Sequence, residues 1–107
     1  MADRYRTYEE FWPLYVSQHL NPICRALHFA GTSFVCLAFV LAVLDSPGWL
    51  LMAPLAGYGF AWFGHFFFEK NRPATFTYPL WSLRADFRMY RLMWLLRMRP
   101  EIGRVAL

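Results

Sequence analysis

Two long uncharged runs are the feature that most constrains how this chain can fold. Residues 26–44 contain no Lys, Arg, Asp or Glu over 19 positions, and residues 49–68 contain none over 20. As α-helices rising 1.5 Å per residue, these runs are roughly 28 to 30 Å long, which matches the hydrocarbon core of a bilayer. The segment between them, residues 45–48, is Asp-Ser-Pro-Gly and is dense in turn formers. The sequence therefore predicts two membrane spans, residues 22–44 and 47–69, joined in a tight hairpin.

The composition agrees with a membrane protein. Hydrophobic residues make up 58% of the chain and charged residues 17%, against about 25% charged in typical globular proteins. Aromatic residues, at 21%, exceed the need of a small core and suit a membrane interface. With 107 residues, the chain is long enough for one domain. We therefore expect a single all-α membrane domain over residues 1–107.

A first, interfacial amphipathic helix is predicted over residues 4–20. Thr7 and Glu10 have the spacing of a capping box, and aromatic residues follow them. Pro13 removes a backbone hydrogen bond if the helix begins near Tyr8, so the helix either kinks there or begins near Trp12. Asn21-Pro22 then has the residues of a helix start, with Asn as the N-cap and Pro at the first helical position.

A basic amphipathic helix is predicted over residues 79–99. It mixes large apolar residues with five arginines: Arg84, Arg88, Arg91, Arg97 and Arg99. This pattern is typical of a helix that lies on an anionic membrane surface. A third membrane span is the alternative, and the charges spread through the first half of the segment argue against it.

The distribution of charge predicts the topology. Residues 70–107 hold eight of the eleven basic residues, whereas residues 45–48 hold none. The positive-inside rule then places both termini in the cytoplasm. The pI of about 9.4 could also indicate nucleic-acid binding, but the basic residues lie beside the apolar runs, which favours lipid. Cys24 and Cys36 would lie roughly 18 Å apart on one helix, so they predict no disulfide.

The three histidines of the chain are predicted to lie at one depth. In a symmetric hairpin that turns between Ser46 and Pro47, His28 and His65 are equally distant from the turn in sequence. His19 precedes the first span by a few residues and should lie close to the same depth. Glu69 follows His65 by four positions, so His65 and Glu69 lie on one helix face. His19, His28, His65 and Glu69 are therefore our candidate catalytic and metal-ligating residues.

More than one chemistry fits these four groups. Two His and one carboxylate with open positions suit non-haem Fe(II), whereas three His and a water suit zinc. Alternatively, each histidine bonds a backbone carbonyl or lies among lipid head groups. Four further residues near this layer are candidates for substrate binding. Lys70, Arg72 and Arg25 could hold a fatty-acid carboxylate or contact lipid phosphate, and Asn71 could orient a ligand or end the helix.

The motifs around these residues resemble a known membrane-protein family. They are His19-x-Asn21-Pro22, then His28, then Phe63-Gly64-His65 followed by Phe68-Glu69-Lys70-x-Arg72-Pro73-Ala74. Over residues 11–87 they are similar to the family of the fungal 2-hydroxy fatty acid dioxygenase. The resemblance implies Fe(2+)-dependent α-oxidation, in which dioxygen cleaves the C1–C2 bond and shortens a 2-hydroxy acyl chain by one carbon. It also implies that His19, His28, His65 and Glu69 match the family's histidines and glutamate.

Two functions are therefore carried forward from the sequence. The first is an iron dioxygenase that acts on 2-hydroxy fatty acids at the membrane. The second is a non-enzymatic membrane module that binds anionic lipid or a partner protein. For both we expect contact with the membrane and no nucleic-acid partner, and a homo-oligomer is compatible with either.

Overall fold

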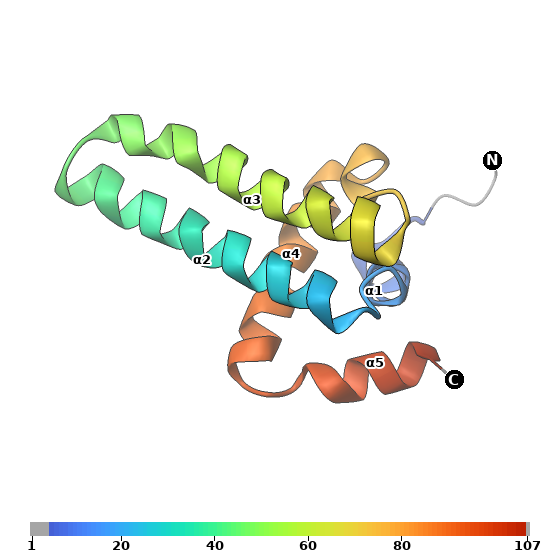
Figure 1. Cartoon of the computed structure of the whole chain (residues 1–107). Helices are drawn as coiled ribbons and strands as arrows, with labels where there is room; N and C mark the ends of the chain where they lie inside the picture. Colours follow the sequence, from blue (N-terminus) through green and yellow to red (C-terminus); the bar gives the residue numbers. More distant parts are fainter. Residues whose placement is uncertain (1–4, 107) are drawn as a thin grey trace.

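The computed structural model describes residues 5–106 and is all-helical over that range, as the sequence predicts (Figure 1). Position 4, where the first helix was expected to begin, lies outside the described residues. The α-helices are α1 (Tyr8–Ser17), α2 (Pro22–Leu44), α3 (Met52–Gly64), α4 (Pro79–Trp94) and α5 (Met98–Ala106). Shorter segments are the 3₁₀ helices η1 (Pro47–Leu51) and η3 (Ala74–Phe76) and the π-helical turn η2 (His65–Glu69).

Helices α2 and α3 run side by side and are joined by a short turn (Figure 1). Local chemistry sets the limits of α2. The Asn21 side chain accepts hydrogen bonds from the backbone N–H groups of Ile23 and Cys24, and Pro22 occupies the first turn. At the other end, Ser46 Oγ accepts from the Gly48 N–H and starts η1. Helix α2 thus occupies the residues expected for the first apolar helix.

The outer surface of this helix pair is apolar and exposed. Pro22–Leu44 and Pro47–Glu69 are both long and apolar enough to cross a membrane. Only 22% and 17% of their most apolar windows are buried, whereas the core helix of a soluble protein is mostly buried. Val43 and Leu55, for example, are 85% and 75% exposed. An exposed apolar surface of this kind is compatible with contact with a membrane.

Glycines allow α2 and α3 to approach closely. A β-carbon on Gly31 would lie 2.9 Å from Phe60 Cβ and 3.0 Å from the backbone oxygen of Ala56. A β-carbon on Gly64 would lie 3.0 Å from Cys24 Sγ. Both positions therefore require the absence of a side chain, as in closely packed membrane helices.

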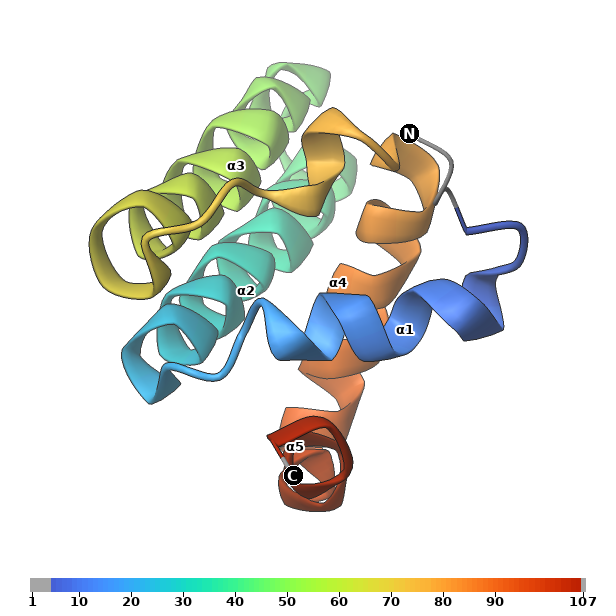
Figure 2. The ribbon, with the colours of Figure 1, turned by 90° about the vertical axis from the view of Figure 1, so that its right-hand side faces the viewer.

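The main cluster of buried residues lies between α1, α4 and α5. Figure 2 shows α1 crossing α4, with α5 packed at the far end of α4. The buried members of this core are Tyr8, Phe11, Trp12, Tyr15, Val16, Ala74, Ala85, Met89 and Met98. The expectation of an interfacial N-terminal helix therefore needs correction. The apolar side of α1 is covered by protein, because its aromatic rings find partners on α4 and α5.

Helix α1 begins at Tyr8 and continues through Pro13. Thr7 Oγ1 accepts a hydrogen bond from the Glu10 N–H, and the Glu10 carboxylate accepts from the Arg6 N–H. These bonds secure the first turn. Pro13 is exposed, so the helix carbonyl that lacks its N–H partner can bond water. The proline neither delays the start of the helix nor ends it.

The single helix expected over residues 79–99 is two helices. Helix α4 ends at Trp94, and Leu96 adopts the left-handed conformation with φ of 57°. The Leu96 N–H donates to the Met93 carbonyl and the Arg97 N–H to the Leu92 carbonyl, which is the Schellman pattern of a helix end. The break turns the chain so that Met98, 5% exposed, reaches the core. This tertiary contact offsets the cost of placing a leucine in a conformation that favours glycine.

Candidate metal centre

The three histidines meet in the interior, between the end of α1 and the adjoining ends of α2 and η2. Their ring centroids are 4.4 Å apart for His19 and His28, 4.5 Å for His19 and His65, and 4.9 Å for His28 and His65. All three side chains are at most 5% exposed. The structure thus brings together three residues that are up to 46 positions apart in the chain.

Each imidazole is oriented by an oxygen atom at its Nδ1. His19 Nδ1 lies 2.6 Å from the Tyr15 carbonyl, and His28 Nδ1 lies 3.0 Å from the Cys24 carbonyl. A carbonyl oxygen only accepts, so Nδ1 carries the proton in both rings. In a neutral imidazole this leaves Nε2 with a free lone pair.

Asn71 orients the third imidazole, that of His65. Asn71 Oδ1 lies 2.7 Å from His65 Nδ1, and Asn71 Nδ2 donates to the Gln18 carbonyl at 3.1 Å. Because the Gln18 carbonyl only accepts, the nitrogen of the Asn71 amide must face it, and the oxygen must face His65. His65 therefore also carries its proton on Nδ1. The backbone N–H of Asn71 bonds to the His65 carbonyl at 3.0 Å, because Lys70 is left-handed and ends the π turn there. Asn71 is thus held to His65 by main chain and side chain together.

The facing lone pairs fit a shared cation. His19 Nε2 and His28 Nε2 lie 3.1 Å apart, and neither atom carries a proton when both neutral rings are protonated at Nδ1. Two nitrogen ligands about 2.1 Å from one metal are separated by roughly 3.0 Å at a right angle and 3.4 Å at a tetrahedral angle. Burial, followed by the neighbouring His28 and His65, lowers the pKa of His19 well below its usual range. The neutral form that binds metals is therefore favoured.

Cys24 belongs to the same cluster. One ligand atom from each of His19, Cys24, His28 and His65 lies within 4.8 Å of the others. Its sulfur is 3.7 Å from His28 Nδ1, the nitrogen that already faces a carbonyl, and it also lies against Gly64. From the sequence, Cys24 was not predicted to lie in the site. A signal was present, because the spacing of four between Cys24 and His28 puts both on one face of α2.

Glu69 lies outside this cluster of ligand atoms. Its Oε2 accepts a hydrogen bond from the Asn21 backbone N–H, and the Asn21 side chain reaches the Phe68 carbonyl at 3.4 Å. The N-terminal end of α2 offers an unpaired N–H and a positive dipole, both of which attract a carboxylate. Glu69 therefore joins the end of η2 to the beginning of α2, and so fixes the helices that carry His28 and His65.

The predicted substrate-binding cations lie at the periphery. Arg25 Nη1 donates to the His19 carbonyl at 2.7 Å. The Arg72 guanidinium carbon lies 5.0 Å from the centre of the Phe76 ring, and Lys70 lies beside it on an open surface hollow. None of these three side chains, nor that of Asn71, lines the apolar cavity between α2, α3 and α4.

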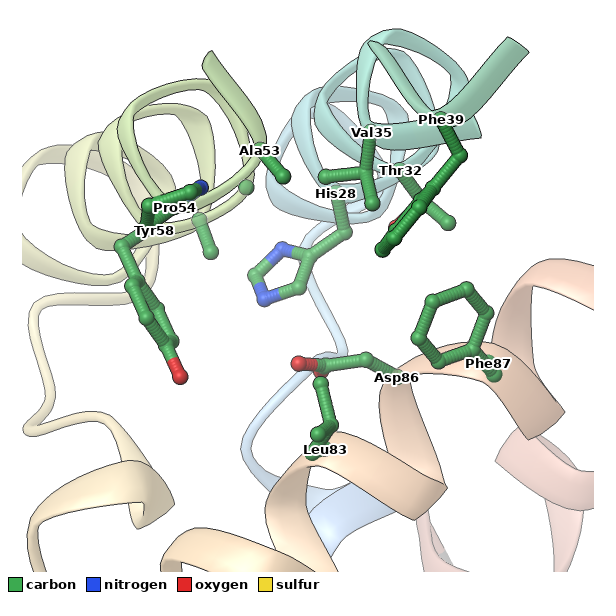
Figure 3. A pocket seen from close by; sticks show the side chains of 12 residues that line it. His28, Thr32, Val35, Phe39, Ala53, Pro54, Tyr58, Leu83, Asp86 and Phe87 are labelled. Atoms are coloured by element: carbon green, nitrogen blue, oxygen red, sulfur yellow. The ribbon is translucent and has the colours of Figure 1, made fainter. Parts of the chain in front are cut away.

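An apolar cavity of about 300 Å³ adjoins the histidines (Figure 3). It lies between α2, α3 and α4, and Figure 3 shows His28, Tyr58 and Asp86 directed into it. Aliphatic and aromatic side chains form most of its wall. The lining residues are His28, Thr32, Val35, Phe39, Ala53, Pro54, Gly57, Tyr58, Ala61, Leu83, Asp86 and Phe87.

Asp86 is the one acidic residue in that lining, and it was not among the residues predicted for the site. The Tyr15 hydroxyl donates a hydrogen bond to its carboxylate. Burial raises the pKa of Asp86 to about 7, against the opposing effect of the Tyr15 bond. Burial and Asp86 together raise the pKa of Tyr15 well above its usual range. The sequence did contain a signal for Asp86, because it is the one acidic residue among the arginines of α4.

The fold and the site together define a class of all-helical protein in which a buried cluster able to bind a metal adjoins an apolar cavity. Within this class the chain can be assigned to a family. Residues 5–98 match the family described as 2-hydroxy-palmitic acid dioxygenase Mpo1-like, and the chain belongs to that family. Comparisons with curated proteins and with solved structures gave no match.

Proposed function

We propose that this protein is an Fe(2+)-dependent dioxygenase of the membrane that cleaves the C1–C2 bond of 2-hydroxy fatty acids. One observation carries the proposal. Three buried imidazoles have their Nδ1 atoms bonded to protein oxygens, so that Nε2 carries the lone pair in each neutral ring, and one of them, His28, lines an apolar cavity. The family description supports a 2-hydroxy acid as the substrate class.

The chain's own residues supply the ligands and their orientation. His19, His28 and His65 would hold the ion, with Cys24 the nearest further donor, while Asn71 keeps His65 in the ligating tautomer. An Fe(2+) ion held there would supply a binding centre for the carboxylate and hydroxyl oxygens of the acid and the redox chemistry that dioxygen requires. In this proposal Glu69 acts through its bond to the Asn21 N–H, as a residue that positions the two helices.

The length of the cavity suits a long acyl chain. His28 and Phe39 both line it and are eleven residues apart on α2, which corresponds to roughly 16 Å. Carbon–carbon bonds of about 1.5 Å at tetrahedral angles advance a chain by about 1.25 Å per methylene. The cavity is therefore long enough for about a dozen methylene groups when the polar end of the acid lies at His28.

The proposal includes insertion of Pro22–Leu44 and Pro47–Glu69 into the bilayer with both termini cytoplasmic. Its support is the exposed apolar surface of the two segments and the concentration of basic residues after them. A reporter enzyme fused at either end should be active on the cytoplasmic side. A C-terminal reporter found on the opposite side would contradict this topology.

The metal and the activity can be tested together. Purified protein, loaded anaerobically with Fe(2+) and desalted, should retain the ion, and in air it should convert 2-hydroxyhexadecanoic acid to pentadecanoic acid. His65→Ala should lose both properties while its helicity is unchanged. Arg72→Gln is the control, because this side chain contacts Phe76 outside the cavity. Wild-type protein that retains no more iron than His65→Ala would refute the proposal.

A second function, binding of anionic lipid, is favoured by a basic hollow beside α1. The Arg84 guanidinium carbon lies 4.0 Å from the Tyr8 ring centre, and that of Arg88 lies 4.1 Å from the Trp12 ring centre. With Arg91 they line an open hollow that could receive a phosphate. Replacing Arg88 and Arg91 with Gln should weaken binding to vesicles that contain phosphatidylserine. Equal binding by the variant and the wild type would exclude this role.

A further inference from the structure

The cavity meets the histidine cluster at one residue. Among His19, Cys24, His28 and His65, His28 alone lines the cavity. A molecule in the cavity therefore approaches the cluster beside His28, and its polar end must lie there. The groups opposite His28 decide which polar end is accepted.

Asp86 is the group on α4 that faces this end. Figure 3 shows its carboxylate directed into the space below His28, between Leu83 and Phe87. A carboxylate in an apolar cavity is costly unless hydrogen-bond donors satisfy it. The Tyr15 hydroxyl is one such donor. A carboxylate has two oxygens and about four acceptor positions, so Asp86 retains capacity for a donor that enters the cavity.

The position of Asp86 is coupled to the cluster through Tyr15. The Tyr15 ring is stacked on the His19 ring, with centroids 4.1 Å apart, and the Tyr15 carbonyl accepts from His19 Nδ1. One residue thus orients both a candidate ligand and the acid of the cavity wall. Such support from packing and hydrogen bonds is what a specific binding site requires.

We infer that Asp86 accepts a hydrogen bond from the 2-hydroxyl group of the bound acid, and that it thereby selects 2-hydroxy fatty acids over unsubstituted ones. This inference rests on the function proposed above and names a specificity-determining residue for it. An unsubstituted acid leaves the carboxylate without this donor, and a site built around a substrate hydroxyl rejects analogues that lack it. The acyl chain contributes equally to both acids, and the metal is the same in the wild type and the variant, so the change in selectivity on replacing Asp86 isolates its role.

The test is comparative binding to the full-length protein loaded anaerobically with Fe(2+), so that no turnover occurs. Dissociation constants for 2-hydroxyhexadecanoic acid and hexadecanoic acid are measured in detergent micelles, and the metal content is measured for each variant. Asp86→Asn keeps an acceptor for the Tyr15 hydroxyl but replaces one carboxylate oxygen with a donor. The preference of Asp86→Asn for the hydroxy acid should be roughly 10- to 100-fold smaller than that of the wild type, and its metal content should be the same.

A paired variant protects the test against misfolding. Asp86→Leu combined with Tyr15→Phe removes both partners of the hydrogen bond while it retains the stacking on His19, and it should show the same loss of preference. The matched control is Ser33→Ala with Tyr90→Phe, because these hydroxyls form a 2.9 Å bond between α2 and α4 outside the cavity. The control should keep the preference of the wild type.

The outcomes separate this inference from the proposed function. If Asp86→Asn or the paired variant prefers the hydroxy acid as strongly as the wild type, the inference is wrong and the proposed function stands. If the wild-type protein retains no iron or binds neither acid, the proposed function fails and the inference fails with it. If the wild type binds both acids equally, the role of Asp86 in selection is refuted.

Discussion

Removing the Asn71 side chain should weaken metal binding without unfolding the protein. The His65 Nδ1–Asn71 Oδ1 bond is 2.7 Å long, and His65 is 2% exposed, so removing the Asn71 side chain leaves the Nδ1 proton without its protein acceptor. A buried donor left unpaired costs about 1–3 kcal/mol. Moving the proton to Nε2 removes that cost but blocks the ring nitrogen that is left to bind a metal. Either way, Asn71→Ala should lower metal affinity about 10–100-fold, or roughly 1.4–2.7 kcal/mol.

The affinity can be measured by anaerobic titration with Co(2+) in competition with a chelator, and circular dichroism reports on folding. Asn71→Asp is the matched variant. It keeps an acceptor for His65 Nδ1 but loses the donor to the Gln18 carbonyl, so its loss should be smaller than that of Asn71→Ala. If Asn71→Ala binds Co(2+) as tightly as the wild type, the orientation of His65 by Asn71 does not matter for ligation. The reasoning from tautomers would then be refuted.

Four further predictions concern packing, chain length and pH. Leu96→Gly should stabilise the protein by about 0.5–1 kcal/mol in thermal unfolding, because Leu96 is left-handed and 89% exposed; a lower melting temperature would contradict this. Gly31→Ala should destabilise it by about 1–3 kcal/mol, because the added carbon would overlap α3, and an unchanged stability would show that α3 can yield. Phe39→Ala should shift binding toward longer acyl chains, whereas Phe34→Ala, which lies outside the cavity, should not. Burial raises the pKa of Asp86 to about 7, so the contribution of its protonated form to stability is lost as pH rises from about 4 to 7. The free energy of unfolding of Asp86→Asn should therefore rise relative to that of the wild type over this window, by at most about 4 kcal/mol. Denaturation of both proteins without metal at each pH measures this. A difference between the two proteins that does not change with pH would contradict it.

The apolar helices were the part of the fold that could be predicted best. Asn21 and Pro22 begin α2 through bonds within one turn, and Asp45 and Ser46 end it in the same local way. Such caps depend on neighbours in the sequence, so they can be predicted from local sequence patterns. The end of α4 was missed for the opposite reason. Its left-handed residue is Leu96 and not glycine, so no local signal marked it.

The site was predictable only in part. The spacing around the turn at Ser46 and Pro47 placed His28 and His65 at one depth, and the structure has them adjacent. The predicted cations Arg25, Lys70 and Arg72 lie away from the cavity, although their depth along the chain was consistent with a role there. Depth along a helix can be counted from sequence, but the direction of a side chain around the helix depends on what packs against it.

The sequence by itself determined the all-helical class, the two apolar helices and the gathering of histidines, because composition, caps and the 1.5 Å rise of a helix are local properties. Only the tertiary structure decided that Glu69 bonds the start of α2 and that Cys24 lies among the histidines. Both outcomes depend on the close approach of α2 to the end of α3 at Gly64, where η2 begins. The crossing of α4 over α2 decided, in the same way, that Asp86 faces the cavity. A contact between helices depends on how their surfaces fit, and no spacing within one helix contains that information.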